Sequence, residues 1–93
     1  MADVLVSASR KLSTYGGYKT EYIEVASMDS ADILKLDSEH GEVKSFNLFE
    51  EDNTNGWAPL SFSVSGTAKN WLTLKTAAKT GIKVKGEIVY VAV

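Results

Sequence analysis

The stretch that decides the fold is residues 60–93, which opens with Leu60-Ser61-Phe62-Ser63-Val64-Ser65-Gly66, continues with Trp71-Leu72-Thr73-Leu74 and closes with an apolar run, residues 82–93. Apolar residues alternate with serines in the first segment, and alternation with period two predicts strands that each bury one face. The polar segments between these runs predict turns. From the alternation we expect a core that contains six side chains of this region: Leu60, Phe62, Val64, Trp71, Val84 and Ile88.

The closing run is apolar on both faces of the predicted strand. One face carries Ile88 and Tyr90, and the other carries Val89, Val91 and Val93. A strand with one wet face should not show this pattern, so its second face needs a cover. We therefore predict an oligomer interface at Val89, Val91 and Val93, formed at the C-terminal strand. Cover from within the chain, by residues 4–9, is the alternative.

Further strands are predicted upstream, with turns between them. Residues 4–9 form a first strand or an N-terminal arm, and residues 20–27, 31–36 and 42–49 form three more, although 31–36 could instead be a short helix. Turns are expected at 13–18 and 37–41, because both contain glycine among polar residues. The predicted fold is an all-β sandwich or small barrel of about seven short antiparallel strands. It forms a single domain, 1–93, in which 1–18 could be a partly extended arm and loop.

Length and composition agree with one small domain. The chain has 93 residues, of which 44% are apolar, and it contains no cysteine. Disulfides and cysteine metal sites are therefore excluded, and a small domain must rely on its core or on partner subunits. The first residues lack the basic and apolar regions of a secretory signal, and no apolar stretch has the length of a membrane helix. We expect no membrane partner.

Charge is nearly balanced but unevenly distributed. The net charge is −2. Acidic residues concentrate in 29–52, whereas lysines dominate 69–85. Both groups suit solvated faces, or an acidic surface could meet the basic surface of a neighbouring copy. Nucleic-acid binding is not expected, because the lysine-rich segment 75–85 contains no aromatic residue that could stack on bases.

Residues that could perform catalysis or bind a metal are scarce. His40 is the only histidine, and it lies in a predicted turn beside Gly41 without a nucleophile motif. We expect an exposed, dispensable side chain, no transition-metal site, no cofactor and no enzymatic activity. Residues 50–55 offer oxygen ligands for calcium, but they do not match an EF-hand and read better as an acidic solvated loop.

Four aromatic residues are candidates for ligand stacking. Tyr15 and Tyr18 flank the Gly16-Gly17 turn, and Trp57 and Trp71 lie near predicted strands. Such rings can stack on sugars, although in a small domain they more often fill the core. A small carbohydrate-binding or ligand-binding β module is therefore the alternative function. Exposed coplanar indoles would favour it, and buried indoles would favour assembly.

The last third also resembles a known group of proteins. Its serine-alternating strand, the Asn70-Trp71-Leu72-Thr73-Leu74 segment and the ending Thr80-Gly81-Ile82-Lys83-Val84-Lys85-Gly86-Glu87-Ile88-Val89 are similar to the closing strands of small virion structural proteins of tailed phages and related archaeal viruses. The resemblance implies a compact β domain in a viral head or on a capsid surface, without catalytic residues. It implies partners that are other copies or a capsid-like protein, and a location in the virion.

Overall fold

The computed structural model describes residues 2–37, 39–52, 56–76 and 78–92. These residues form nine strands and no helix. The strands are β1 (Asp3–Val4), β2 (Ala8–Tyr15), β3 (Tyr18–Met28), β4 (Ile33–Lys35), β5 (His40–Asp52), β6 (Gly56–Pro59), β7 (Phe62–Ser65), β8 (Trp71–Leu74) and β9 (Ile82–Ala92). The described residues thus contain no helix that could cross a membrane.

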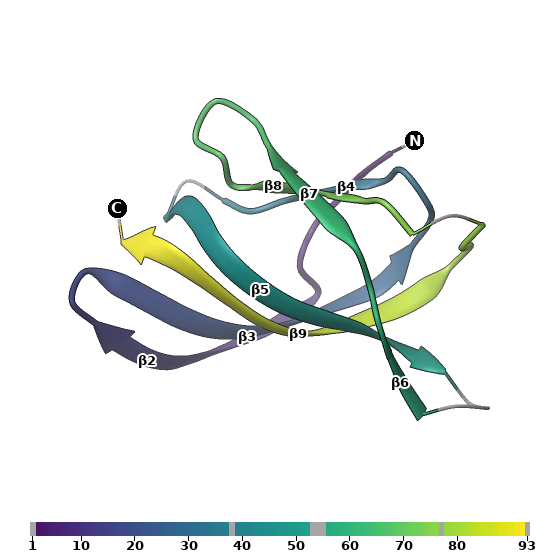
Figure 1. The fold of residues 1–93 in the computed structure, drawn as a ribbon, viewed down its shortest axis with the longest axis horizontal. Coiled ribbons are helices and arrows are strands. Elements are labelled where there is room, and N and C mark those ends of the chain that lie inside the picture. The colour runs from purple at the N-terminus through teal and green to yellow at the C-terminus, as the bar shows by residue number, and fades with distance from the viewer. Residues whose placement is uncertain (1, 38, 53–55, 77, 93) are drawn as a thin grey trace.

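The strands form two sheets that pack as a sandwich, which confirms the predicted all-β class (Figure 1). One sheet has the order β1-β4-β8-β7, and the other has the order β2-β3-β9-β5-β6. The prediction of about seven strands is too low for two reasons. First, the predicted strand 4–9 is divided between β1 and β2. Second, the acidic stretch predicted as a loop lies partly in β5, and the end of β5 pairs with the additional strand β6.

The N-terminal segment connects the two sheets. β1 pairs in parallel with β4 in one sheet, and the chain then crosses to become the edge strand β2 of the other sheet (Figure 1). The expectation that all strands are antiparallel is therefore wrong at β1. The predicted loop 13–18 is shorter than expected, because β2 and β3 continue until only Gly16 and Gly17 form the turn. Both glycines have positive φ, which a tight turn requires.

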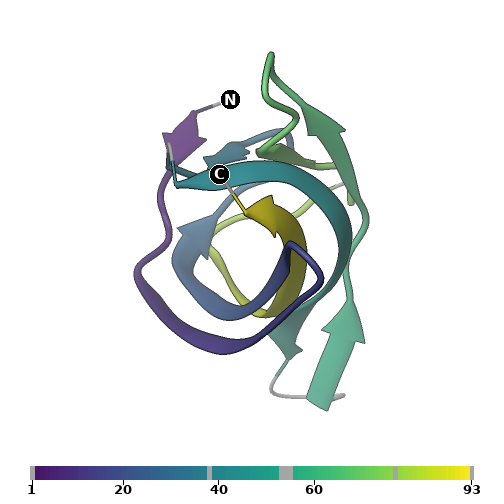
Figure 2. The ribbon, with the colours of Figure 1, turned by 90° about the vertical axis from the view of Figure 1, so that its left-hand side faces the viewer.

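The closing strand β9 lies in the middle of the five-stranded sheet, between β3 and β5. Its backbone is therefore paired on both sides, by β3 and β5, and the predicted association through the C-terminal strand stays a prediction that concerns its outer face. The sheet curls strongly, and β3, β9 and β5 wrap around the core (Figure 2). This central place pairs both edges of β9, whereas Val89 and Val91 on its outer face remain only half-buried.

The core forms between the two sheets. Leu60, Phe62, Val84 and Ile88 are buried, as predicted. Val64 is not, since it is 39% exposed at the edge strand β7, although it pairs with the buried Leu72 and so faces the expected side. Trp71 is only half-buried, because β8 turns its two leucines inward instead.

Candidate functional site

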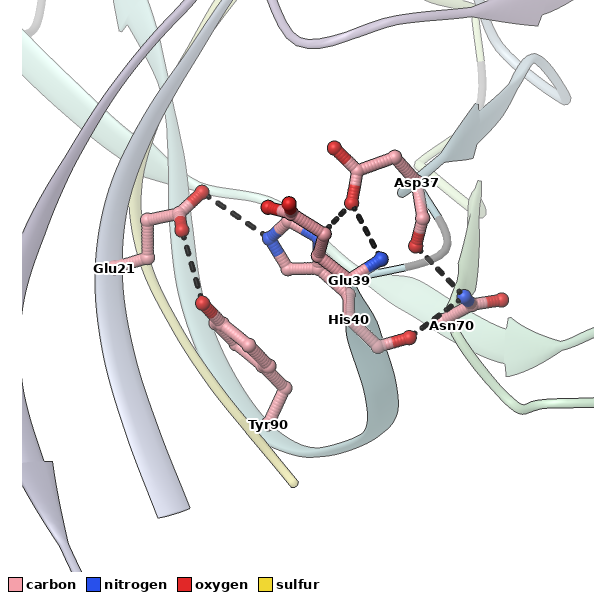
Figure 3. A network of polar contacts seen from close by, with 6 residues as sticks. All are labelled: Glu21, Asp37, Glu39, His40, Asn70 and Tyr90. Atoms are coloured by element: carbon pink, nitrogen blue, oxygen red, sulfur yellow. Dashed lines mark hydrogen bonds and ion pairs between the residues drawn. The ribbon is translucent and has the colours of Figure 1, made fainter. Parts of the chain in front are cut away.

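A cluster of polar side chains lies at one end of the curled sheet, where β5 begins (Figure 3). His40, the first residue of β5, is 9% exposed, and its Nε2 lies 3.2 Å from Oε2 of Glu21 on β3. Its Nδ1 lies 2.7 Å from Oδ1 of Asp37. The Tyr90 hydroxyl of β9 donates to Glu21 Oε1 at 3.0 Å. The expectation that His40 is an exposed turn residue is wrong. The strand β5 begins earlier than predicted, at His40 itself, and the side chain is buried against Glu21 and Tyr90.

The backbone carbonyl and the ring of His40 make two further contacts, with Asn70 and with Tyr90. The side-chain amide of Asn70 donates to the His40 carbonyl at 2.9 Å, which joins this corner to the segment before β8. The rings of His40 and Tyr90 pack with centroids 4.3 Å apart. Together these contacts connect both sheets around one buried imidazole, so the cluster is a clamp between them.

The protonation chemistry of the clamp follows from its geometry. Both ring nitrogens of His40 lie within hydrogen-bond distance of a carboxylate, that of Asp37 at Nδ1 and that of Glu21 at Nε2. The hydrogen bond from His40 lowers the pKa of Asp37 below its usual value of 3.8. A lowered pKa means that Asp37 contributes stability above its unfolded pKa and loses it as the pH falls through the folded value.

The contacts of His40 leave no ring nitrogen available for general base catalysis. Both ring nitrogens of His40 are occupied by carboxylates, so neither is free to accept a proton from a nucleophile. Ser7 and Ser9 line the adjoining hollow of about 440 Å³, but the Ser7 hydroxyl already donates to the Glu24 carbonyl. No buried side-chain polar atom in the described part of the chain lacks a partner.

The titration of Tyr90 gives a measurable consequence. Burial, and next the hydrogen bond to Glu21, raise the pKa of Tyr90 to about 12. The neutral phenol therefore stabilises the fold fully below its unfolded pKa of 10, and this stabilisation is lost as the pH rises from 10 toward 12. We expect the free energy of unfolding to fall by about 2–3 kcal/mol over this window. Urea unfolding at several pH values would measure it.

Two tyrosine variants isolate this effect from the titration of lysines. Tyr90→Phe should be less stable at neutral pH but should show a smaller loss between pH 10 and 12 than the parent. Tyr18→Phe, at a side chain that is 45% exposed, should keep the parental dependence. An identical pH profile for the parent and Tyr90→Phe would contradict the assignment.

A second candidate site lies on the outer face of the five-stranded sheet. Tyr22 of β3, Phe49 of β5 and Trp57 of β6 surround a hollow of about 370 Å³, whose lining is completed by Lys85 and Gly86 of β9. Trp57 is 51% exposed, and Tyr22 and Phe49 are half-buried. We name these three side chains the aromatic patch. The tryptophan is outside the core because β6 is an edge strand on which Trp57 pairs with Glu51, facing outward.

The charges beside the aromatic patch are already paired within the chain. The ammonium of Lys85 lies 3.4 Å from Glu24 Oε1 and 5.1 Å from the centroid of the Trp57 ring. Lys83 approaches Glu51 at 3.9 Å. The surface is therefore apolar at its centre with neutralised charges around it, which is the composition of a protein contact surface.

The other predicted stacking residues do not join this patch. Trp71 lies on the four-stranded sheet, with the Lys35 ammonium 4.0 Å from its ring centroid. Its indole packs so closely on Gly66 that a Cβ there would lie 2.9 Å from the ring. Tyr18 is exposed near the β2–β3 turn, and the Tyr15 side chain lies outside the described part of the chain. The structure therefore forms neither the pair of coplanar exposed indoles expected for sugar binding nor the buried indoles expected for assembly.

The predicted interface valines lie on the same outer face as the aromatic patch, toward the other end of β9. Val91 pairs with Tyr18 and Val89 pairs with Thr20, and both valines are half-buried. Val93 lies outside the described residues. The predicted oligomer interface at this face stays a prediction.

The acidic residues that offered a calcium option, although a solvated loop was the favoured interpretation, are engaged where they are described. Glu50 forms an ion pair with Lys79, and Glu51 approaches Lys83. Residues 53–55 lie outside the described parts of the chain. Among the described residues no group of three or more possible metal ligands is found.

Comparison with known proteins adds no relative to this picture. No protein-family model, curated protein or solved structure matches the chain.

Proposed function

We propose that this protein is a non-enzymatic assembly component that acts through contacts with other copies or with a capsid-like protein. The virion setting comes from the resemblance of the last third to small phage and archaeal-virus structural proteins. The polar clamp around His40 supports a structural reading, because its groups are used for joining the two sheets. The proposal stands mainly on the aromatic patch.

The exposure of the aromatic patch carries the proposal. Trp57 leaves half of its surface in water beside Tyr22 and Phe49, although burying such rings is strongly favourable. Tryptophan and tyrosine are also the residues that most often dominate binding energy at protein interfaces. A domain of this size without disulfides gains stability when such a surface is covered by a partner. Val89 and Val91 extend the same face.

Self-association tests the proposal directly. We expect the parent protein to associate at concentrations on the order of tens of micromolar, and Trp57→Ser to weaken association about 30-fold, the equivalent of about 2 kcal/mol. Sedimentation velocity over a concentration series would measure both. Leu5→Ser is the matched control, because Leu5 is 74% exposed but lies away from the patch.

Two outcomes would contradict self-assembly. The first is a parent protein that stays monomeric over the whole concentration series. The second is equal association of Trp57→Ser and Leu5→Ser. Val91→Lys gives a second probe, since a lysine on the outer face should weaken association without breaking the backbone pairing of β9.

Carbohydrate binding is the alternative that the exposure of Trp57 favours. The Lys85–Glu24 pair beside the ring offers a donor and an acceptor to sugar hydroxyls. The remaining lining of the hollow, however, is apolar apart from the Tyr22 hydroxyl. Saturable quenching of tryptophan fluorescence by an oligosaccharide, lost in Trp57→Phe, would support this function over assembly.

A further inference from the structure

The edge strand β2 is unusually accessible. It pairs only with β3, and every described side chain from Ala8 to Thr14 is exposed, on both faces of the strand. Figure 2 shows β2 on the outside of the curled sheet. The peptide groups that point away from β3 are therefore open to a further strand.

The protections that usually block such an edge are incomplete here. The opposite edge of the same sheet, β6, has four residues and includes Pro59, which cannot donate to a ladder. β2 has eight residues and no proline. A bulge between Lys11 and Ser13 divides its pairing with β3 into two regular segments, Ala8–Lys11 and Ser13–Tyr15.

The first of these segments, Ala8–Lys11, carries two positively charged side chains, Arg10 and Lys11. Arg10 pairs with Tyr22 and so faces outward, whereas Lys11 pairs with the buried Glu21 and so faces the inner side. Neither cation forms an ion pair within the described parts of the chain. The edge therefore presents one cation on each of its faces.

We propose that β2 binds an extended acidic segment of another protein as an added strand. Backbone hydrogen bonds would provide affinity, and adjacent carboxylates, which point to opposite faces of a strand, would meet Arg10 and Lys11. A second β2 fits poorly, because antiparallel pairing centred on the two cations sets Arg10 opposite Lys11 of the other copy. The acidic segment of this chain around Glu50 cannot supply the added strand, because its backbone is already paired with β6 on one side and with β9 on the other.

A neighbouring hollow adds selectivity on the inner side. The hollow of about 440 Å³ beside His40 is bordered by Ser7, Ala8 and Ser9 at the start of β2. Leu5, Val6 and Leu36 contribute apolar walls to it. Strand addition commonly uses such pockets to read alternate side chains. An apolar residue near the acidic pair would suit this position.

Two blocked peptides test the proposal. Both alternate threonine and valine, and one carries two adjacent glutamates at its centre whereas the other carries two adjacent lysines. In amide NMR titrations at low salt, the glutamate peptide should shift the amides of β2 and should bind about three- to tenfold more tightly than the lysine peptide, the range that two exposed ion pairs allow. Added salt should reduce the difference.

The matched protein variants complete the test. Arg10→Ser combined with Lys11→Ser should remove the preference for the glutamate peptide, whereas Lys75→Ser, at another exposed lysine, should retain it. Shifts that map away from β2, no binding, or equal binding of both peptides would overturn the proposal, and the cations would then only guard the edge against pairing. Since Trp57 lies elsewhere, this result is independent of the self-association experiment.

Discussion

Replacing Gly86 by alanine is expected to reduce the free energy of unfolding by about 4–6 kcal/mol, which is most of what a small domain has. Gly86 lies in the central strand β9 with φ +153°, a backbone conformation that side chains rarely adopt. An added Cβ would lie 2.0 Å from the carbonyl oxygen of Asn47 on β5. Because the obstacle is the backbone of a paired strand, no rotamer change can relieve it, and the two strands must separate.

A second glycine serves as the control for backbone strain alone. Gly16 has φ +57° in the β2–β3 turn, and nothing lies within 4 Å of an added Cβ. Gly16→Ala should therefore cost only about 1 kcal/mol, the usual cost of a left-handed conformation. Urea unfolding followed by circular dichroism would compare the variants. Equal losses at both sites would show that the clash with Asn47 does not limit the fold.

The sequence predicts where the strands lie better than it predicts which strands pair with one another. Alternation in residues 60–74 identifies β7 and β8, and it places Phe62 correctly on the buried face. The place of β9 could not be read from the same pattern, because an apolar strand needs cover whether it lies at an edge or in the centre. Only the pairing of β9 with both β3 and β5 distinguishes the two.

The candidate sites differ in how far the sequence reveals them. A signal for the polar clamp exists, since Glu21 shares a face with the buried Ile23 and Val25, and a carboxylate in that position needs a buried partner. That the partner is His40 depends on the curl of the sheet. The aromatic patch carries no such signal, because the exposure of Trp57 depends on the pairing of β6 at the sheet edge.

Replacing His40 by alanine is expected to cost about 3–5 kcal/mol, in contrast to the negligible effect expected for a turn residue. The variant removes the partner of Glu21 Oε2 and leaves that buried carboxylate, among the described residues, with the Tyr90 hydroxyl as its hydrogen-bond partner. It also opens a space beneath the Tyr90 ring. For a domain of this size the loss corresponds to a fall in Tm of about 12 °C or more, which differential scanning calorimetry would detect.

A double-mutant cycle separates the charge from the lost volume. If the uncompensated Glu21 carboxylate causes most of the loss, Glu21→Gln in the His40→Ala background should restore part of the stability, whereas Glu21→Gln alone should destabilise the parent. Glu39→Ala, at an exposed neighbour in the same turn, should change the unfolding free energy by less than about 0.5 kcal/mol. A His40→Ala protein that melts at the temperature of the parent would mean that the clamp does not hold the sheets together, because the buried Glu21 carboxylate would then tolerate the loss of its contact with the imidazole.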